Sequence, residues 1–464
     1  MKGTLRESDA PWLDIVHGLK RDYVYAPGRR KPVMRRMENE ITIQRGSHQI
    51  GGCVTEVETQ GHRIIIDFGG NLPGNREGGI SDEELLRTVF DGRVCDGVLF
   101  THYHGDHMGL YKKIPREIPL YIGPTAKKLL EILTQELDSY PKTAEKGLPR
   151  VRSMNCYVPG QGINSFGDIL VTPFVVDHSA LDAYMFLIEA GKKRILFTGD
   201  FRDHGVAGEY NTLEKMVRDY IGKIDILITE GTMLSRGDEK RHNPIRTEAD
   251  LGKQARKLFE ANKETVILVS STNLDSIMEF YHGLPWGMDF VCDAYQAKLM
   301  LAAMEDKGKY YKAYRPEMIH GKPRRLYIVG DMKGLGAGQN CYPADFSILK
   351  RKGFTMLARE KTRFKKIMEC FSDPLIIYSK WEGFLGGEHA DPAILDFIGN
   401  HRMTKLHTSG HAYVETIEKL IRMTDPEVII PMHTERADDF GSIPAFESCR
   451  DRVRVLQDGE EYCF

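Results

Sequence analysis

The sequence lacks long apolar runs, paired cysteines, repeats and low-complexity segments, and its 464 residues carry a net charge of only −2. Without a run of about eighteen apolar residues, or an apolar segment behind the charged amino terminus, neither a membrane span nor a secretory signal is predicted. The eight cysteines include no CxxC pair, which argues against a disulfide framework and a cysteine-zinc site. Reduced thiols favour a cytoplasmic protein. The absence of long apolar runs favours one that does not enter membranes. Because the net charge is close to zero, any basic surface of this protein must be local.

Hydrophobic residues make up 41% of the chain and charged residues 28%, as in an ordinary globular protein. The length exceeds what one hydrophobic core usually supports, so two domains, or one domain with an insertion, are expected. Residues 1–40 read as a basic extension with one short amphipathic helix over residues 12–19. This extension is either a solvated arm or an arm that contacts polyphosphate.

From Ile41 onward, short apolar strands alternate with amphipathic helices, which indicates an α/β layered fold. A regular strand–helix rhythm in the middle of the chain predicts a small parallel sheet of its own. The chain then resumes with a helix predicted over residues 411–423 and a strand over residues 427–431. The predicted organisation is a main domain over residues 41–235, an inserted domain over 236–395 and a return segment of the main domain over 396–464.

The most informative segment is residues 102–107, which place three histidines and an aspartate directly after an apolar run. Alternate side chains of a strand share a face, so His102 and His104 can point at one metal ion. Asp106 and His107, on the turn that follows, can reach a second metal ion. A histidine-rich surface loop is the alternative, and this dense spacing argues against it.

The segment resembles the HxHxDH motif of the metallo-β-lactamase superfamily. The resemblance implies further ligands at the ends of later strands, and His178 and Asp200 occupy such positions. A carboxylate that ends a buried strand, as Asp200 does, requires a compensating cation. Asp67 matches the first motif of the superfamily, where the carboxylate orients the ligand loop and does not bind metal.

Three later segments resemble motifs A, B and C of the β-CASP group, which comprises RNase J, the cleavage and polyadenylation endonucleases and the Artemis-type DNA nucleases. They are centred on Glu230, His411 and His433. A histidine in motif C favours RNA over DNA as the substrate. The chain resembles RNase J most closely, but motif A has glutamate in place of aspartate, and no room remains for the C-terminal domain. The resemblance therefore implies a compact RNase J-like nuclease with a metallo-β-lactamase αββα sandwich and an inserted β-CASP α/β domain.

The resemblance also implies a mechanism, in which two Zn²⁺ ions share a hydroxide that attacks phosphorus and leaves a 5′-phosphate. His411 is the expected acid for the departing 3′-oxygen, and Glu230 is expected to hold it. Mn²⁺ is an alternative metal on ligand type alone. Cleavage is endonucleolytic, 5′-exonucleolytic or both. The implied ligands are His102, His104 and His178 for one ion and Asp106, His107 and His433 for the other, with Asp200 bridging; Asp106 and Asp67 are also counted with the catalytic groups.

Substrate contacts are predicted from weaker signals. Ser270, Ser271, Thr272 and Asn273 precede a helix and can form an anion site or simply an N-cap. Ser409 and Gly410 of motif B are further candidates. Basic residues over 350–366 make either a solvated face or a phosphate contact. Trp381 either stacks a base or packs in the core, and the glycine-rich residues 334–338 indicate a loop.

Two other activities share this metal chemistry. A DNA nuclease of the Artemis type is opposed by His433, and a small-molecule metallo-hydrolase would need neither the insertion nor motifs A to C. A non-catalytic scaffold would have lost ligands, whereas this chain retains all seven. The expected partner is RNA, single-stranded, with no membrane, and a homodimer is left open.

Overall fold

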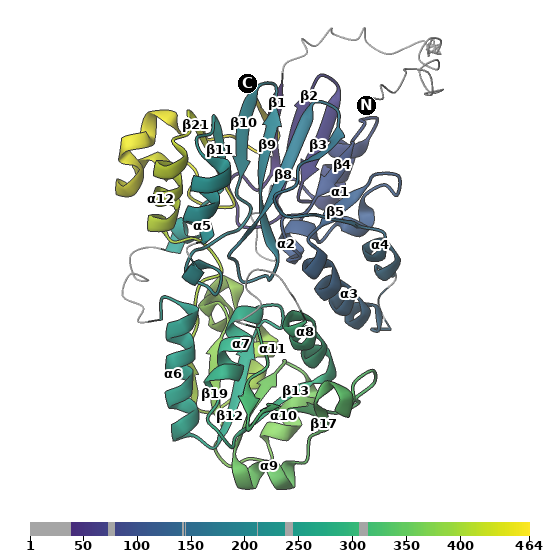
Figure 1. Cartoon of the computed structure of the whole chain (residues 1–464), viewed down its shortest axis with the longest axis vertical. Helices are drawn as coiled ribbons and strands as arrows, with labels where there is room; N and C mark the ends of the chain where they lie inside the picture. Colours follow the sequence, from purple (N-terminus) through teal and green to yellow (C-terminus); the bar gives the residue numbers. More distant parts are fainter. Residues whose placement is uncertain are drawn as a thin grey trace, which may run out of the picture. The chain divides into compact units, whose positions relative to one another are not determined.

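The computed structural model describes residues 39–72, 79–141, 143, 145–210, 212–236, 245–305 and 314–464. These residues form three large sheets and a small hairpin, with helices against the sheets (Figure 1). The basic extension predicted over residues 1–40, with its helix over residues 12–19, lies outside the described residues except for its last two positions. In the described part of the chain, no helix has the length and apolar content that crossing a membrane requires.

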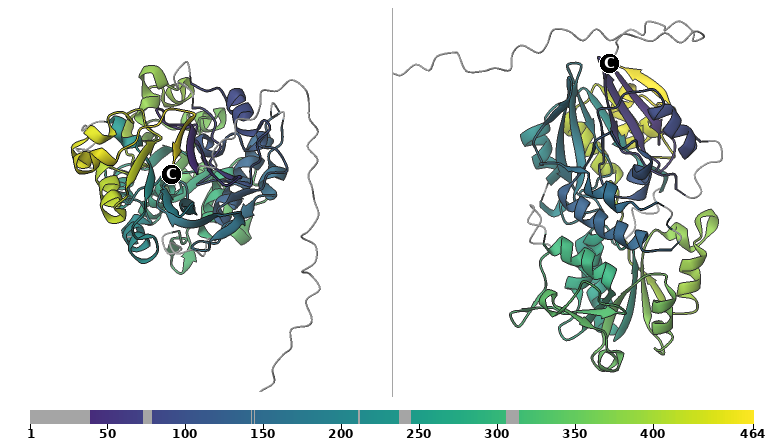
Figure 2. Two further views of the ribbon diagram at one scale, coloured as in Figure 1. Left: turned by 90° about the horizontal axis from the view of Figure 1, so that it is seen from above. Right: turned by 90° about the vertical axis from the view of Figure 1, so that its right-hand side faces the viewer.

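The first sheet supplies the loop that carries the histidine cluster. In spatial order its strands are β22 (Glu460–Cys463), β1 (Glu40–Arg45), β2 (Val54–Thr59), β3 (His62–Ile66), β4 (Gly97–Leu99), β5 (Leu120–Ile122) and β6 (Asn155–Cys156). Strands β3, β4 and β5 are parallel, so their carboxyl ends meet at one edge of the sheet. The views in Figure 2 show the yellow carboxyl-terminal strand beside purple β1, with which it pairs.

The second sheet brings the remaining polar strand ends to the same region. Its order is β21 (Val428–Met432), β11 (Ile226–Glu230), β10 (Lys193–Phe197), β9 (Ala183–Ala190), β8 (Ile169–Val176) and β7 (Ile163–Phe166). Strands β10, β11 and β21 are parallel, and both β8 and β10 run antiparallel to β9. Strands β8, β10, β11 and β21 therefore all point their carboxyl ends to one edge.

The two sheets pack face to face with helices outside them, which confirms the αββα sandwich. Ile64 and Val57 of the first sheet share a buried cluster with Ile188 and Ile195 of the second. The outer layers bury amphipathic faces against the sheets. Beside the first sheet lie α1 (Asp82–Phe90), α2 (Gly105–Met108), α3 (Pro124–Asp138) and α4 (Leu148–Arg152); beside the second lie α5 (Thr212–Met216) and α12 (Val414–Thr424).

The insertion forms a parallel sheet of its own, as its rhythm predicted. The order is β17 (Cys341–Pro343), β16 (Leu326–Val329), β13 (Asp289–Asp293), β18 (Phe354–Ala358), β12 (Glu264–Val269), β19 (Leu375–Ser379) and β20 (Met403–Lys405). Parallel strands covered on both faces read as continuous apolar runs, which is why β12 and β19 were recognisable. The strand β20 lies beyond the expected boundary at residue 395, so we propose that the insertion ends after Lys405.

Helices and one hairpin complete the insertion. They are α6 (Glu248–Ala261), α7 (Leu274–Gly283), α8 (Ala294–Met304), α9 (Phe346–Lys352), α10 (Thr362–Met368), α11 (Pro392–Ile398) and the hairpin β14 (Met318–Ile319) and β15 (Lys322–Pro323). The side chains of Asn273 and Asp293 cap α7 and α8 by accepting backbone N–H groups. The carboxyl ends of β12 and β13 thus lead directly into helices, and both of these junctions line cavities described below.

Candidate active site

Three imidazoles converge where β4 and β8 end. The Nε2 atom of His102 lies 3.1 Å from Nδ1 of His104, and Nε2 of His178 lies 3.3 Å from the same Nδ1. These three nitrogens lie within 4.8 Å of one another, and His102 and His178 are fully buried. The geometry brings together three of the predicted ligands and is compatible with one metal ion between them.

A second group of predicted ligands lies beside the first. The Nε2 atom of His433 is 3.4 Å from Oδ2 of Asp106, and Nε2 of His107 is 3.9 Å from the same oxygen. Asp200 lies between the two groups: its Oδ2 is 3.1 Å from Nε2 of His107 and 3.9 Å from Nε2 of His102. Its Oδ1 is 3.8 Å from Nδ1 of His433. The carboxylate is therefore within reach of both groups.

The far sides of four imidazole rings are held by the protein, which fixes the nitrogen that each presents to the centre. His107 Nδ1 is 2.8 Å from Asp67 Oδ2, and His178 Nδ1 is 2.6 Å from the carbonyl oxygen of Gly410. The Nδ1 atoms of His102 and His433 lie 3.0 Å and 2.7 Å from the hydroxyls of Thr101 and Thr232. A ring that donates Nδ1–H outward presents the lone pair of Nε2 inward. His104 differs, because its Nδ1 faces the cluster.

Asp67 lies behind the ring of His107, where its carboxylate can orient that ring. Its two oxygens accept from the N–H of Thr101 at 2.7 Å and from the Thr101 hydroxyl at 2.8 Å, besides facing His107. The residue is fully buried, and burial raises the pKa of its carboxyl although His107 acts in the opposite direction. Its backbone has φ of 59°, which aspartate tolerates better than most residues.

The chemistry of the donor set fits divalent cations. Burial lowers the pKa of His102 and of His178 well below the usual value and lowers the pKa of His104 to about 4, so these rings are neutral. When the nitrogens that face one another are all unprotonated, they cannot hydrogen-bond to each other, but their lone pairs can bind a metal ion. In the described residues, Nε2 of His107 and Oδ1 of Asp200 are buried and make no contact with hydrogen-bond geometry, although Nε2 of His107 lies 3.1 Å from the other oxygen of Asp200. Orphaned buried polar atoms of this kind are the expected signature of a metal site.

His411 and Glu230 lie at the opening of this cluster. His411 Nδ1 is 3.1 Å from Glu230 Oε2 and 3.5 Å from Asp200 Oδ2. Glu230 is buried, and its Oε1 accepts the N–H groups of Phe201 at 3.0 Å and Ala412 at 3.2 Å. The helix predicted to begin at His411 begins instead at Val414, so that prediction was wrong. His411 lies in the preceding loop because the chain stays extended at the N-cap Tyr413.

The candidate substrate residues divide into two sets. Ser270, Ser271, Thr272 and Asn273 line a cavity of about 540 Å³ together with His104, Gly410, His411 and Trp381. Asn273 also forms the N-cap, since its side chain accepts the N–H of Ser276 at 3.2 Å. Ser409 is buried outside this lining, where its hydroxyl accepts the N–H of His411 at 3.1 Å. Trp381 is at the cavity and not in the core, the position that the base-stacking alternative requires.

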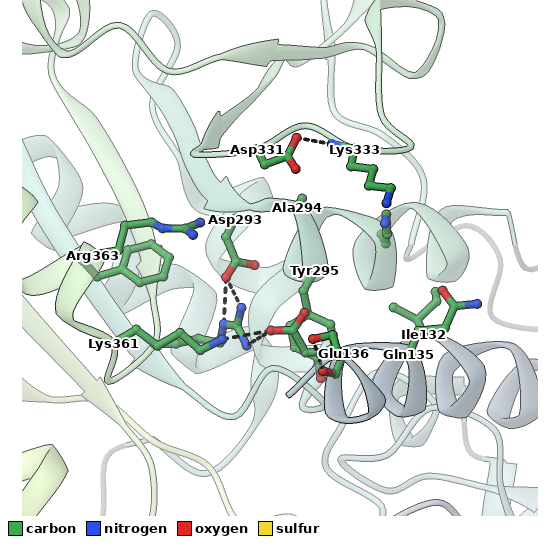
Figure 3. A pocket seen from close by; sticks show the side chains of 14 residues that line it. Ile132, Gln135, Glu136, Asp293, Ala294, Tyr295, Asp331, Lys333, Lys361 and Arg363 are labelled. Atoms are coloured by element: carbon green, nitrogen blue, oxygen red, sulfur yellow. Dashed lines mark hydrogen bonds and ion pairs between the residues drawn. The ribbon is translucent and has the colours of Figure 1, made fainter. Parts of the chain in front are cut away.

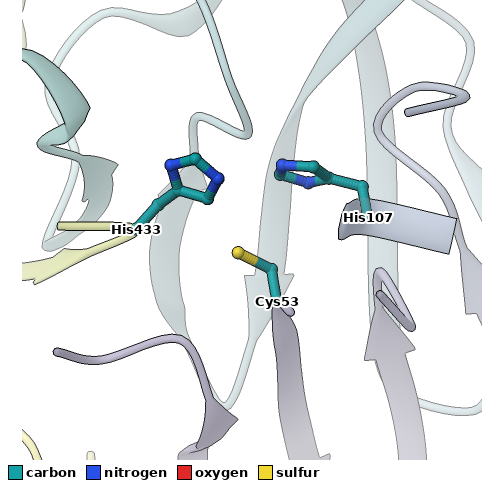
Figure 4. A group of neighbouring side chains, drawn as sticks. All are labelled: Cys53, His107 and His433. Atoms are coloured by element: carbon teal, nitrogen blue, oxygen red, sulfur yellow. The ribbon is translucent and has the colours of Figure 1, made fainter. Parts of the chain in front are cut away.

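Sequence reasoning missed Cys53, which lies next to the second group of ligands. Its Sγ and one ring nitrogen each of His107 and His433 lie within 4.8 Å of one another (Figure 4). Burial raises the pKa of this thiol well above its usual value, so it remains protonated in the absence of a metal ion. Nothing in the spacing of the eight cysteines distinguishes Cys53, because its partners are far away in the sequence.

Arg202 was missed as well, although it joins three of the motif loops. It is fully buried and donates from Nε to Asp177 at 3.0 Å and from Nη1 to the carbonyl of Ser409 at 2.8 Å. Two carboxylates of the insertion, Glu248 at 3.0 Å and Asp275 at 2.6 Å, complete its surroundings. The one feature of the sequence that could have drawn attention to Arg202 is its position two residues after Asp200.

Comparison with known proteins agrees with this geometry. Residues 52–209 match the Metallo-beta-lactamase superfamily, and residues 400–441 match the Zn-dependent metallo-hydrolase RNA specificity domain. Ribonuclease J of Helicobacter pylori is 23% identical over 418 residues, which cover 85% of this chain and 56% of the relative. Ribonuclease J of Mycobacterium tuberculosis is 22% identical over 420 residues, covering 85% and 68%. This chain thus spans about half the length of the Helicobacter relative.

A solved structure has the same fold. The protein of unknown function from Enterococcus faecalis V583 superposes with a TM-score of 0.71 at 22% identity, over 92% of this chain and 100% of that one. The matched domains imply binding of divalent metal, and the side chains gathered here are the candidate ligands. Residues 52–209 therefore form a metallo-β-lactamase domain, and the chain as a whole is similar to RNase J.

Proposed function

We propose that the chain is a metal-dependent ribonuclease that hydrolyses phosphodiester bonds of RNA and leaves a 5′-phosphate. The observation that carries the proposal is the contact of His411 with Glu230, at the opening of the cluster formed by the seven predicted metal ligands. A metal centre alone would suit many hydrolases. An imidazole beside it, held by a buried carboxylate, adds the group that a departing alkoxide needs.

Two Zn²⁺ ions are proposed, with Mn²⁺ as the alternative. His102, His104 and His178 would hold one ion, and Asp106, His107 and His433 would hold the other, with Asp200 between them. When bound, the ions would lower the pKa of water and offset the negative charge that develops on the phosphoryl oxygens. Asp67 and the other outward hydrogen-bond partners keep the rings aimed at the centre.

The proton chemistry falls to His411. We propose that its imidazole gives a proton to the departing 3′-oxygen. Glu230 Oε2 faces Nδ1 at 3.1 Å, so the opposite nitrogen, Nε2, can serve the substrate. Because Glu230 Oε1 is fixed by the two backbone N–H groups of Phe201 and Ala412, the carboxylate cannot rotate away. Glu230 thus acts by orienting the acid and stabilising its charged form.

RNA is preferred over DNA and over small molecules for separate reasons. The matched RNA specificity domain spans residues 400–441, which include both His411 and His433, and the two relatives compared above are ribonucleases by name. A cavity of about 540 Å³ is of the size that holds about one nucleotide and cannot hold a duplex, which favours an unpaired strand. A cytoplasmic location is proposed from the eight free thiols. A homodimer is left as a proposal that sedimentation can test.

The test uses RNA and DNA oligonucleotides of one sequence, the RNA carrying a 5′-hydroxyl, monophosphate or triphosphate. We expect metal-dependent cleavage of RNA, and we expect His411→Ala to lower kcat by about 10²- to 10⁴-fold. Metal content, measured by mass spectrometry, should stay at two ions per chain, because His411 is not among the proposed ligands.

His401→Ala is the matched control, since this half-buried histidine lies in the insertion before β20. It should cleave RNA at the wild-type rate. Faster cleavage of DNA would contradict the choice of RNA. If the His411 variant cleaved RNA at the wild-type rate, His411 would not be the acid that protonates the departing 3′-oxygen.

A further inference from the structure

A second cavity, of about 460 Å³, lies outside the metal centre (Figure 3). One wall is the α3 helix of the main domain, with Glu136. The other walls belong to the insertion: the start of α8, the loop after β16 and the segment that enters α10. Its side chains belong to none of the motifs that define the metal centre.

Two of the three carboxylates in this cavity are already engaged by neighbouring cations. Arg359 Nε donates to Asp293 Oδ2 at 2.8 Å, and its Nη1 donates to Glu136 Oε1 at 3.0 Å. Lys361 Nζ donates to the same Glu136 oxygen at 2.9 Å. These contacts join the insertion to α3, and the two cations neutralise the negative charges of Glu136 and Asp293.

Besides these paired groups, the cavity is lined by three more cationic side chains and one more carboxylate. Among the described residues, Lys298, Lys333 and Arg363 form no ion pair within 4.0 Å. The remaining carboxylate, Asp331, is turned to the backbone: its Oδ1 accepts the N–H of Lys333 at 2.9 Å. The cavity is therefore electropositive, and unneutralised cations in a concave site attract anions.

The loop after β16 is shaped to approach these cations. Gly330 has φ of 85°, and a Cβ atom there would lie 2.4 Å from Nη1 of Arg363. Gly334 has φ of 79°, and a Cβ atom there would lie 3.5 Å from Nζ of Lys298. The positive φ of these residues is a conformation that glycine adopts readily, and with it the loop passes close to Arg363. Gly334, the first of the glycine-rich residues, thus lies beside Lys298, and the basic residues Arg359, Lys361 and Arg363 line the cavity itself.

The electropositive cavity adjoins the active-site cavity. Tyr295 and Arg359 line both, and the Arg359 guanidinium lies 4.7 Å from the centroid of the Tyr295 ring. We propose that this cavity binds internucleotide phosphates of an RNA strand that extends out of the active site past Arg359. The proposal rests on the ribonuclease function above and adds a second phosphate subsite, held by Lys298, Lys333 and Arg363.

The test compares short and long RNA in the Lys298→Gln/Lys333→Gln variant. A dinucleotide, the shortest RNA with a phosphodiester bond, hardly extends beyond the active-site cavity, whereas RNA of about sixteen nucleotides reaches both cavities. With the long RNA we expect about tenfold weaker binding at 0.1 M salt and a salt-dependence slope smaller by about 1.4, because two phosphate contacts are lost. With the short RNA, Kd, kcat and KM should be unchanged. Binding is measured by fluorescence anisotropy in the His411→Ala background, which slows hydrolysis and keeps the metal ions, and kcat and KM are measured separately with His411 intact.

The matched control is Lys253→Gln/Lys257→Gln, which removes two exposed lysines of α6 in the same insertion. It should bind both RNAs as the wild type does. Equal losses for short and long RNA, or wild-type behaviour of the cavity variant at both lengths, would overturn the subsite while leaving the ribonuclease intact. A wild-type protein that cleaves no RNA at all would instead reject the function.

A further arm uses AMP and orthophosphate as probes. The proposal expects neither to bind this cavity tightly, because one phosphate makes fewer contacts than an extended strand. If AMP binds, if the cavity variant abolishes that binding and if long RNA is unaffected, the site serves a free phosphate compound and the RNA assignment is wrong.

Discussion

At the scale of single residues, the metal centre depends on groups that stand behind the imidazoles. Asp67 and the carbonyl of Gly410 hold the rings of His107 and His178 at 2.8 Å and 2.6 Å. Such contacts fix which nitrogen faces the centre, and they raise the basicity of the ligand. The residues themselves were predictable from motifs, but the direction of each ring was not.

Replacing Asp67 tests this orientation. In Asp67→Asn, one oxygen must serve both the Thr101 groups and His107, so the hold on His107 weakens. We expect affinity for Zn²⁺ to fall by about 10- to 100-fold at one of two sites. Asparagine tolerates the φ of 59°, so the fold should persist.

The measurement is a competition titration against a chelating dye, with circular dichroism to verify folding. Asp438→Asn is the matched control, because it breaks a 3.3 Å contact between a carboxylate and His48 on the surface. Its two zinc affinities should equal those of the wild type. An Asp67 variant with unchanged affinities would show that His107 needs no partner to bind metal.

At the scale of elements, strands were easier to predict than helix starts. The apolar pattern over residues 169–176 predicts a strand and the amphipathic pattern over residues 82–90 predicts a helix, and β8 and α1 have these bounds. The start of α12 was placed three residues too early, since the loop Ser409–Tyr413 is held by contacts with Glu230 and Ser409 and not by its own propensity. The strand β22 was missed because its sequence, EEYC, has little apolar signal and is completed only by pairing with β1.

The packing of α6 on α7 makes a prediction about pH. Glu279 of α7 faces Gly252 of α6, where a Cβ atom would lie 2.2 Å from Oε2 of Glu279. Burial, followed by the nearby Glu248, raises the pKa of Glu279 from 4.5 to about 8. The folded protein therefore keeps a proton that the unfolded chain releases. This contribution to stability is fully present below pH 4.5 and is lost as pH rises through 8.

Glu279→Gln cannot ionise and should not lose stability in that window. We expect its free energy of unfolding to be similar to that of the wild type at pH 5 and higher by up to about 3 kcal/mol at pH 8.5. Urea unfolding at both pH values measures it, with Glu260→Gln on the exposed face of α6 as the control. A variant less stable than the wild type at pH 8.5 would mean that Glu279 is charged and stabilising.

At the scale of the whole described unit, Arg202 connects the metal loops to the insertion. Its guanidinium contacts Asp177 beside His178, the carbonyl of Ser409 beside motif B, and the insertion carboxylates Glu248 and Asp275. A single buried cation thus joins segments that are 25 to 207 residues away in the sequence. The planar fork of arginine can reach these acceptors at once, which an ammonium cannot do.

Arg202→Met should therefore cost more than an ordinary core substitution. It leaves three buried carboxylates without their cation, and we expect the free energy of unfolding to fall by about 3–5 kcal/mol. Arg202→Lys keeps the positive charge but forms fewer hydrogen bonds, so its free energy of unfolding should fall by less than that of Arg202→Met. Urea unfolding measures both variants. Arg246→Met, which removes a half-exposed arginine, is the control and should change stability by less than about 1 kcal/mol; equal losses in the Arg202 and Arg246 variants would contradict the role of Arg202.

By itself, the sequence indicated an α/β layered fold and a parallel sheet in the insertion, because apolar periodicity is a local pattern. The αββα arrangement and the seven predicted ligands were implied by the resemblance of its motifs, several of them at strand ends, to the metallo-β-lactamase superfamily and the β-CASP group. Only the tertiary structure decided that Cys53 lies beside His107 and His433, that Arg202 joins four segments and that Lys298, Lys333 and Arg363 surround one cavity. The reason is physical: each of these groupings gathers side chains from strands and loops that meet only when the sheets pack, so no spacing along the chain records it.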